Sequence, residues 1–380
     1  MTARTVVRMT SLFDPITLRG TTFHNRAWLA PMCQYSATAG VPGDWHLVHL
    51  GARAAGGFGL LLAEATAVVP EGRISPQDTG LWNDEQVAAW RRITEFVHAR
   101  GTHVGVQLAH AGRKASTYRP FAASSGSVPA ADGGWGTVGP SDRAFPGYAA
   151  PSAMTADDIA AVPGQFAAAA RRALAAGFDT VELHAAHGYL LHQFLSPLSN
   201  QRDDEYGGSA ENRARLLVET ADAVRAAWPD ERPLLVRVSA TDWLDGGLVV
   251  DDVAQVVKEL AGHGVDLVDV STGGNALAPV PVGPGYQVPA AAEVRATSGL
   301  PVAAVGMLDD PHLAQRILAD GEADAVLVGR GALRDPSWPL RAAHDLGVAA
   351  PALDVVEPTA DVALATTTGW QPQYARGAWH

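Results

Sequence analysis

Eight short, continuous apolar runs recur along the chain, and most of them are followed by a helical stretch. Because apolar and polar residues do not alternate within them, the runs are typical of parallel strands buried on both faces. The predicted strands are Ala27–Pro31, Gly59–Ala65, His103–Leu108, Thr180–His184, Leu234–Ser239, Leu267–Ser271, Val302–Val305 and Ala325–Val328. The predicted helices are Asp84–Arg100, Thr155–Ala176, Ser209–Trp228, Asp251–His263, Val288–Thr297 and Asp309–Asp320. This order predicts an α/β fold, a (β/α)8 TIM barrel rather than an open sheet.

Two segments stand outside this repeat. Leu12–Phe23, ahead of the first strand, resembles a short hairpin that turns near Arg19-Gly20, and we expect it to close the barrel floor. Residues 112–154, after the third strand, are rich in Gly, Pro, Ser and Ala and show no helical period. A long loop inside a compact domain is usually functional, so we expect this loop excursion to cap the barrel mouth. No low-complexity linker divides the chain, so residues 1–380 are predicted to form a single domain.

Composition and charge exclude several classes of protein. The 28 Lys and Arg residues against 40 Asp and Glu residues give a net charge of −12, which disfavours nucleic-acid binding. Cys33 is the single cysteine, so an intramolecular disulfide and a four-cysteine metal or iron–sulfur site are excluded. The longest uncharged run, Val270–Ala292, contains four prolines and is typical of a loop, not of a membrane span. Because Met1–Thr10 contain no apolar secretion signal, we expect a cytoplasmic protein.

In a (β/α)8 barrel the chemistry lies at the carboxyl ends of the strands, so the residues there form the candidate site. This set contains imidazoles, phenols, an amide and arginines, which together can bind anions and polar rings and transfer protons. In chain order it consists of Ala30, Pro31, Met32, Cys33, Tyr35, Ala65, Gln107, His184, His187, Tyr189, Arg237, Gly306, Gly329 and Arg330.

His184, His187 and Tyr189 come where the fourth strand leaves into a loop, so all three can face one cavity. Two imidazoles can donate hydrogen bonds to one substrate oxygen, and a phenol beside them can deliver a proton. The His-x-x-His spacing also suits a metal-ligand pair, although no carboxylate or cysteine ligands accompany it. A structural role is the third alternative, and the motif alone leaves all three open.

Arg237 lies in the middle of an apolar strand. Because an unpaired buried charge is too costly, its side chain must face a partner. That partner is either an anion or polar ligand edge, or a carboxylate on a neighbouring strand such as Glu182 or Glu64. The sequence favours neither alternative.

Gly306, Gly329 and Arg330 end the last two strands, where barrels commonly bind phosphate. Glycines at strand ends are also ordinary turn residues. With Arg237, however, these positions indicate a ligand that has a phosphate at one end and an electron-rich ring at the other. Flavin mononucleotide (FMN) fits that description.

Cys33 and Gln107 end the first and third strands. A lone buried cysteine is most often a small apolar residue, but its place at the barrel mouth also suits a redox or substrate-facing role. The amide of Gln107 both donates and accepts hydrogen bonds, which suits the edge of a pyrimidine-like ring.

Four motifs resemble those of the old yellow enzyme family of flavin ene-reductases, over a region from Leu12 to Pro336. Cys33 with Tyr35, and the C-terminal run Gln373-Tyr374-Ala375-Arg376-Gly377, resemble its bacterial thermophilic-like branch, which includes xenobiotic reductases. The motifs are Ala30-Pro31-Met32-Cys33-Gln34-Tyr35, Gln107-Leu108-Ala109-His110-Ala111-Gly112-Arg113, His184-Ala185-Ala186-His187-Gly188-Tyr189-Leu190, and Asn200-Gln201-Arg202 with Tyr206-Gly207-Gly208-Ser209 and Asn212-Arg213.

The resemblance implies FMN held without a covalent bond. Gln107 would bond the pyrimidine edge of the flavin, Arg237 would lie near N1 and O2, and Cys33 would tune the flavin potential. His184 and His187 would hold the substrate oxygen, and Tyr189 would be the proton donor. The predicted flavin site consists of Ala30, Pro31, Met32, Cys33, Ala65, Gln107, Arg237, Gly306, Gly329 and Arg330. The predicted substrate site consists of Tyr35, His184, His187 and Arg376.

The implied reaction is ping-pong. NADPH reduces FMN and leaves, and an enone, maleimide or nitroalkene then accepts hydride at its activated C=C bond. The two histidines stabilise the developing oxyanion, and Tyr189 protonates the α-carbon. One flavin serves both half-reactions, which agrees with the lack of a G-x-G-x-x-G dinucleotide motif.

Three alternatives differ from this interpretation. A 2,4-dienoyl-CoA reductase-like flavoprotein needs a cysteine cluster for iron–sulfur and further nucleotide domains, and this chain has one cysteine. A flavin-free, metal-dependent TIM-barrel hydrolase would use the His-x-x-His pair as ligands. A flavoprotein sensor or binding module would bind flavin without turnover.

The tail, residues 365–380, contains Trp370, Tyr374 and Trp379 around Arg376. An exposed tail normally frays, but aromatic residues and arginine are favoured anchors in interfaces. In relatives of this branch, an arginine near the C-terminus reaches a neighbouring subunit's site. We therefore expect a homo-oligomer, a dimer or tetramer, in which Arg376 reaches the neighbour's FMN.

Overall fold

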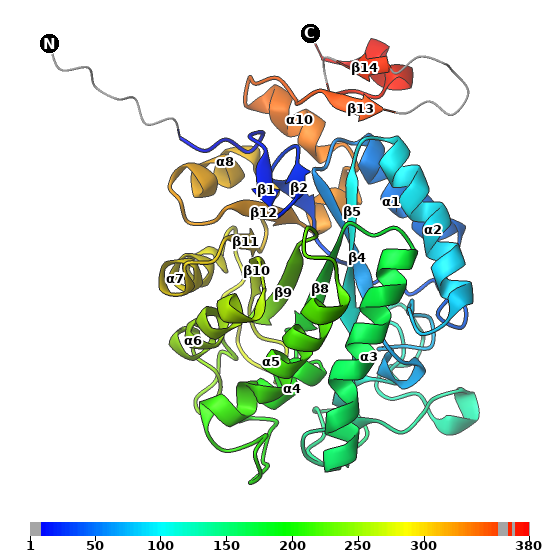
Figure 1. Ribbon diagram of the computed structural model, residues 1–380, viewed down its shortest axis with the longest axis vertical. Helices are drawn as coiled ribbons and strands as arrows, with labels where there is room; N and C mark the ends of the chain where they lie inside the picture. Colours follow the sequence, from blue (N-terminus) through cyan, green and yellow to red (C-terminus); the bar gives the residue numbers. More distant parts are fainter. Residues whose placement is uncertain (1–8, 356–363, 367–368, 380) are drawn as a thin grey trace, which may run out of the picture.

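A closed barrel of eight parallel strands forms the centre of the computed structural model, which describes residues 9–355, 364–366 and 369–379 (Figure 1). The last barrel strand pairs in parallel with the first, which closes the sheet. Every predicted strand is present, so the prediction of a (β/α)8 barrel is confirmed. The strands are β3 (Ala27–Leu29), β4 (Leu60–Ala67), β5 (His103–Ala109), β8 (Thr180–Ala185), β9 (Leu234–Ser239), β10 (Leu267–Ser271), β11 (Val302–Val305) and β12 (Ala325–Val328).

Helices surround the barrel, and all six predicted helices are present (Figure 1). Four further helices, α1, α4, α9 and α10, were not predicted. The helices are α1 (Asp44–Ala55), α2 (Asp84–Ala99), α3 (Ala156–Ala175), α4 (Leu190–Leu195), α5 (Ala210–Ala227), α6 (Val250–Leu260), α7 (Val288–Ser298), α8 (Pro311–Ala319), α9 (Arg330–Arg334) and α10 (Trp338–Asp345).

Side-chain caps begin several of the predicted helices. The side chains of Asn83, Thr155 and Ser209 each accept a hydrogen bond from a backbone N–H of the first turn of α2, α3 and α5. In contrast, α1 begins after Gly43, which has no side chain to accept such a bond. The start of α1 therefore lacks the capping hydroxyl or amide that marks α2, α3 and α5.

A hairpin closes the amino-terminal end of the barrel, as predicted. β1 (Ile16–Leu18) pairs antiparallel with β2 (Thr21–Phe23), and the turn lies at Arg19-Gly20. Its apolar side chains pack against inward-facing residues of the strands. This cluster, here called the apolar end, consists of Ile16, Leu18, Phe23, Trp28, Ala30, Leu60, Leu62, Leu235, Leu267, Ala303, Ala325 and Leu327.

Two positions further along the same strands, the barrel interior becomes polar. In a strand, residues i and i+2 face the same side, so Leu235 and Arg237 of β9 both point inward, as do Leu267 and Asp269 of β10. The side chains of this second cluster are all buried. The cluster, here called the polar end, consists of Gln107, Glu182, His184, Arg237 and Asp269.

The excursion, residues 112–154, contains no α-helix. It has 3₁₀ turns at Gly112–Lys114 and Ala130–Asp132, and the two-residue strands β6 (Val138–Gly139) and β7 (Ser152–Ala153) pair in parallel. It lies at the carboxyl ends of the barrel strands (Figure 1). The first turn of the excursion therefore adjoins the loops in which chemistry is expected.

The described part of the tail lies at the opposite end of the barrel, beside the hairpin (Figure 1). β13 (Leu353–Val355) pairs antiparallel with β14 (Leu364–Thr366), and a 3₁₀ helix spans Pro372–Gly377. Gln371 accepts a hydrogen bond from the Arg100 guanidinium and donates one to the Arg100 carbonyl. Among the described residues, no helix is both long and apolar enough to cross a membrane.

Candidate active site

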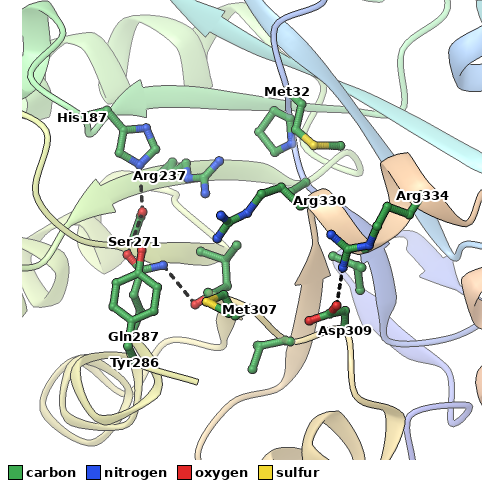
Figure 2. A pocket seen from close by; sticks show the side chains of 18 residues that line it. Met32, His187, Arg237, Ser271, Tyr286, Gln287, Met307, Asp309, Arg330 and Arg334 are labelled. Carbon is green, nitrogen blue, oxygen red and sulfur yellow. Dashed lines mark hydrogen bonds and ion pairs between the residues drawn. The ribbon is translucent and has the colours of Figure 1, made fainter. Parts of the chain in front are cut away.

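A cavity of about 370 Å³ opens at the carboxyl ends of the strands (Figure 2). Its volume is within the range of small-molecule sites. The predicted residues that line it are Ala30, Pro31, Met32, His187, Arg237, Gly306, Gly329 and Arg330. Lining residues that were not predicted include Ser271, Tyr286, Gln287, Met307, Asp309 and Arg334.

One end of the cavity is basic. Arg330 begins α9, and its guanidinium makes no hydrogen bond or ion pair with the other described residues. Arg334, one turn later, is paired with Asp309 (Figure 2). Gly306 has φ +122°, and a Cβ atom there would lie 3.0 Å from Nε2 of Gln287, so the wall requires glycine. This end therefore offers a guanidinium and uncrowded backbone to an anionic group.

Arg237, on β9, lines the same cavity (Figure 2). Its Nε lies 3.0 Å from Oδ2 of Asp269, its register partner on β10, although the N–H is not aligned for a hydrogen bond. The sequence left open a polar ligand or a carboxylate on a neighbouring strand, such as Glu182 or Glu64, and the carboxylate beside Arg237 is that of Asp269. The charge of Arg237 also acts on Glu182. Glu64 pairs instead with His46 at 3.1 Å. Arg237 donates no hydrogen bond within the described residues; its Nε faces Asp269, and its terminal N–H groups remain available to the cavity.

Two buried carboxylates share this one arginine. Glu182 accepts a hydrogen bond from Nε2 of Gln107 at 2.8 Å, while its Oε2 has no partner among the described residues. Glu182 and Asp269 are both 0% exposed. Burial raises the pKa of each carboxyl above its ordinary value, and the charge of Arg237 opposes that rise. The polar end is therefore short of positive charge, which favours retention of a proton.

His184, His187 and Tyr189 lie together, as their spacing predicted. The His184 ring meets the His187 ring at 5.2 Å and the Tyr189 ring at 4.8 Å, both edge to face. Nδ1 of His184 accepts a hydrogen bond from the Ala186 N–H at 3.3 Å, so its hydrogen is on Nε2. Burial, and next the charge of Arg237, lower the pKa of both imidazoles, which are therefore neutral donors. Burial raises the pKa of Tyr189, which keeps it a phenol.

His187 is held in an uncommon backbone conformation, with φ +58°. Its N–H donates to Oγ of Ser239 at 2.9 Å, and its Nε2 lies 2.8 Å from Oγ of Ser271 (Figure 2). The Ser271 hydroxyl donates in turn to Oε1 of Gln287, so Nε2 of His187 carries the hydrogen. Ser271 was visible as a strand-end residue, but Gln287 lies 16 positions later in a loop and gave no signal.

Cys33, Tyr35 and Ala65 lie beside Tyr189 rather than in the wall of the cavity. Cys33 and Tyr189 pack on a small apolar cluster that contains Ala65. Burial raises the pKa of the Cys33 thiol well above its ordinary value, so it is not a thiolate. Tyr35 has φ +52°, and its ring meets Phe121 of the excursion edge to face at 6.1 Å.

Comparison with known proteins identifies the family. A model of the NADH:flavin oxidoreductase / NADH oxidase family matches residues 11–348. The chain is 47% identical over 359 residues to an NADH:flavin oxidoreductase of Gibberella zeae, covering 89% of this chain and 86% of the relative. It is 45% identical over 341 residues to an NADPH dehydrogenase of Geobacillus thermodenitrificans, covering 89% and 95% of the two chains.

The chain belongs to the NADH:flavin oxidoreductase / NADH oxidase family. This is the family of the old yellow enzyme, so the predicted resemblance and the prediction of a flavin oxidoreductase are confirmed.

Solved structures agree with this assignment of the oxidoreductase. Morphinone reductase superposes with a TM-score of 0.75 at 29% identity, covering 94% of this chain and 96% of that one. An old yellow enzyme homologue from Zymomonas mobilis gives 0.74 at 29% identity, covering 98% and 100%. A 2-naphthoyl-CoA reductase gives 0.80 at 25% identity, and this chain covers 53% of its length.

The geometry around His184 and His187 bears on the metal-dependent alternative. Among the described residues, no group of three or more His, Cys, Asp or Glu side chains is placed to hold a metal ion. The third side chain in this cluster is the phenol of Tyr189, which contacts the His184 ring. The geometry of the oxidoreductase therefore favours hydrogen bonding over metal ligation at this motif.

Arg376 is the one predicted site residue whose side chain lies outside the described part of the structure. Its backbone belongs to the 3₁₀ helix Pro372–Gly377, on the hairpin side of the barrel. Nearby, Trp370 and Trp379 meet at 5.3 Å, and Trp379 stacks on His344 of α10. This part of the tail therefore packs on its own chain, at the end of the barrel away from the cavity.

Proposed function

We propose that the protein is an FMN-dependent ene-reductase that takes hydride from NADPH and reduces the activated C=C bond of enones, maleimides or nitroalkenes. The observation that carries this proposal is a buried arginine, Arg237, which lines the same cavity as Arg330 and whose terminal N–H groups make no hydrogen bond among the described residues. A ligand with a polar ring edge and a phosphate satisfies both. The same cavity wall contains His187 of the hydrogen-bonding cluster.

The residues present fit FMN. Arg330 would hold the phosphate, and Ala30, Pro31 and Met32 would line the flavin. Arg237 would donate to the edge of the ring that gains negative charge on reduction. Gln107 donates one amide N–H to Glu182, and its carbonyl oxygen remains to accept a hydrogen bond from the ring. When bound, FMN would supply hydride transfer, which no side chain can perform.

The histidines would bind the substrate's carbonyl or nitro oxygen. Nε2–H of His184 has no partner among the described residues and is available as a donor. Nε2–H of His187 would exchange Oγ of Ser271 for the substrate oxygen. As neutral donors already fixed in place, both would stabilise negative charge that develops on that oxygen.

Tyr189 would then protonate the α-carbon. Its phenol is 4.8 Å from the His184 ring, measured between ring centroids, and its raised pKa keeps the proton on the oxygen until the substrate demands it. Tyr35 and Cys33 would shape the substrate end of the site beside it.

The tail supports an oligomeric form of this proposal. Because the described tail lies at the hairpin end of its own barrel, Arg376 is remote from its own cavity. We therefore propose a homo-oligomer, in which Arg376 serves a neighbouring site. A half-buried, protonated Cys33 also suits a reducing compartment such as the cytoplasm.

An anaerobic absorption spectrum tests the proposed function. The purified protein should carry a flavin band, NADPH should bleach it, and 2-cyclohexenone should restore it. A protein without flavin, or a flavin that NADPH does not reduce, contradicts the proposal. Bleaching without recovery by an enone, a maleimide or a nitroalkene leaves a flavin sensor as the better interpretation.

A further inference from the structure

Lys114, one of two lysines in the chain, lies at the junction of three loops around the candidate site. It ends the 3₁₀ turn Gly112–Lys114 at the start of the excursion. Its Nζ donates to the carbonyl oxygen of His187 at 2.8 Å and to that of Gly274 at 2.9 Å. It therefore ties the excursion to the loops that follow β8 and β10.

Two aromatic rings complete the surroundings of this ammonium. Nζ lies 4.6 Å from the ring centre of Phe145, in the excursion, and 5.2 Å from that of Tyr189. A cation over the face of a ring is attracted by the ring's quadrupole, and the attraction grows where water is excluded. The charge of Lys114 thus acts on Tyr189 as well as on His187.

No carboxylate offsets this charge among the described residues. The titratable groups that face it are Arg113 on its own turn, and His184, His187 and Tyr189 on β8 and the following loop. All of them are neutral or positive. Burial, and next the charge of Arg113, lower the pKa of Lys114 to about 8. A charge that is partly withdrawn from water without a counter-ion is costly, and among the described residues the two carbonyls and the two rings compensate it.

The turn to which Lys114 bonds has an uncommon backbone conformation and a close backbone contact. His187 has φ +58°, a conformation that residues other than glycine rarely adopt. Gly274 approaches it so closely that a Cβ atom on Gly274 would lie 2.6 Å from the His187 Cα. Lys114 bonds to both sides of this contact, so removing its ammonium frees two carbonyls and the backbone of His187 together.

We propose that Lys114 is a positioning residue for the reduction of the C=C bond. Its ammonium fixes the turn that aims His187, and it stabilises the Tyr189 phenolate formed when that residue gives up its proton. In that step the O–H bond of Tyr189 breaks, a C–H bond forms at the α-carbon, and the enolate's negative charge passes to the phenolate oxygen. Solvent then returns a proton to Tyr189. This inference rests on the proposed function.

The inference gives the reaction an alkaline limit. Above the lowered pKa of Lys114 the amine is neutral, so its hold on His187 and its support of the phenolate weaken. The rate at which an enone re-oxidises the reduced flavin should therefore fall as the pH rises through about 8.

Stopped-flow re-oxidation by 2-cyclohexenone, which does not titrate, measures this limit between about pH 6 and pH 10. We expect Lys114→Met to be about 10- to 100-fold slower than the wild type at neutral pH and to lack the alkaline limb. Lys114→Arg, whose guanidinium stays charged, should keep its rate at high pH. Lys258→Met changes the other lysine, exposed on α6, and should match the wild type.

The controls separate two kinds of failure. Flavin content and thermal unfolding show whether each variant is folded and loaded, and Lys114→Arg tests the pH limit if Lys114→Met does not fold. Lys114→Met with the wild-type rate and limb, or Lys114→Arg with an unmoved limb, overturns the role of Lys114. A wild type without flavin, or one that enones do not re-oxidise, overturns the proposed function and this inference with it.

Discussion

The two ends of the barrel interior are built from the same strands, but burial of side chains stabilises the fold at one end and costs free energy at the other. At the apolar end, Leu235 and Leu267 are buried against the hairpin, and burial itself stabilises the fold. At the polar end, Arg237 and Asp269 follow two positions later on the same strands, and burial there costs free energy.

This difference teaches how the barrel separates stability from function. Apolar contacts are not directional, so the apolar end needs only side chains of suitable volume. The polar end needs specific partners, and several remain incomplete. Oε2 of Glu182 and both oxygens of Asp269 lack hydrogen bonds among the described residues. Incomplete satisfaction beside a cavity indicates a ligand site.

Tyr189→Phe should give the largest effect, a slower re-oxidation of the flavin. Tyr189 lies outside the polar end, next to His184. Loss of a general acid lowers a rate by about 10²–10⁴-fold. We expect that loss in re-oxidation by an enone, with reduction of the flavin by NADPH nearly unchanged. Stopped-flow measurement of both half-reactions tests this, and equal re-oxidation rates would assign the proton to water.

Arg237→Leu makes the polar end resemble the apolar end. It leaves Asp269 and Glu182 buried without a cation, which should cost about 3–5 kcal/mol of unfolding free energy. Burial raises the pKa of both carboxyls, so their stability contribution is complete at low pH and is lost as pH rises. The loss in the variant should therefore grow from about pH 4 upward, which urea unfolding at several pH values measures. A pH-independent loss would contradict the shared-charge arrangement.

Leu235→Ala is the matched change at the apolar end, two positions earlier on β9. Removing a fully buried leucine side chain typically costs about 2–5 kcal/mol. We expect the loss to be independent of pH, and the folded variant to keep the flavin affinity of the wild type. Urea unfolding and flavin titration measure the two quantities. Weakened flavin binding would show that the two ends are coupled.

His184→Ala and His187→Ala test the donors next to the polar end. Para-substituted phenols, bound as phenolates, should lose about 1.5–3 kcal/mol of binding free energy when one donor is removed. Titration of the flavin absorption band with para-chlorophenol measures this. If a chelator abolishes binding in the wild type, the metal-ligand interpretation of the motif is correct instead.

Glu182→Gln should have the smallest effect. Burial raises the pKa of Glu182 to about 8, so its carboxyl keeps a proton at neutral pH and the amide replaces it closely. In the wild type Glu182 contributes a loss of stability as the pH rises from about 4.5 towards 8, and the variant lacks that contribution. The variant should therefore gain stability relative to the wild type over that window. Parallel pH profiles would mean that Glu182 is ionised throughout.

The sequence predicted most of the barrel because its strands and most of its long helices carry local signals. Continuous apolar runs gave all eight strands, and Asn83, Thr155 and Ser209 act as caps of helices that were foreseen. α1, which begins after Gly43 and so has no capping side chain, was missed, whereas α6 and α7 were predicted although they too begin without a side-chain cap. His184, His187 and Tyr189 were predicted to lie together because they fall within five positions of one another at one strand end, and their rings are in contact.

Only the tertiary structure decided which partners the buried charges have. Arg237 meets Asp269, 32 positions away, because β9 and β10 pair in that register, and not Glu64 as considered from the sequence. Lys114 meets the carbonyl of His187, 73 positions away, because the excursion folds back over the strand ends. Composition and local periodicity do not encode strand register or loop path, and one residue of register shift would exchange every inward side chain for an outward one.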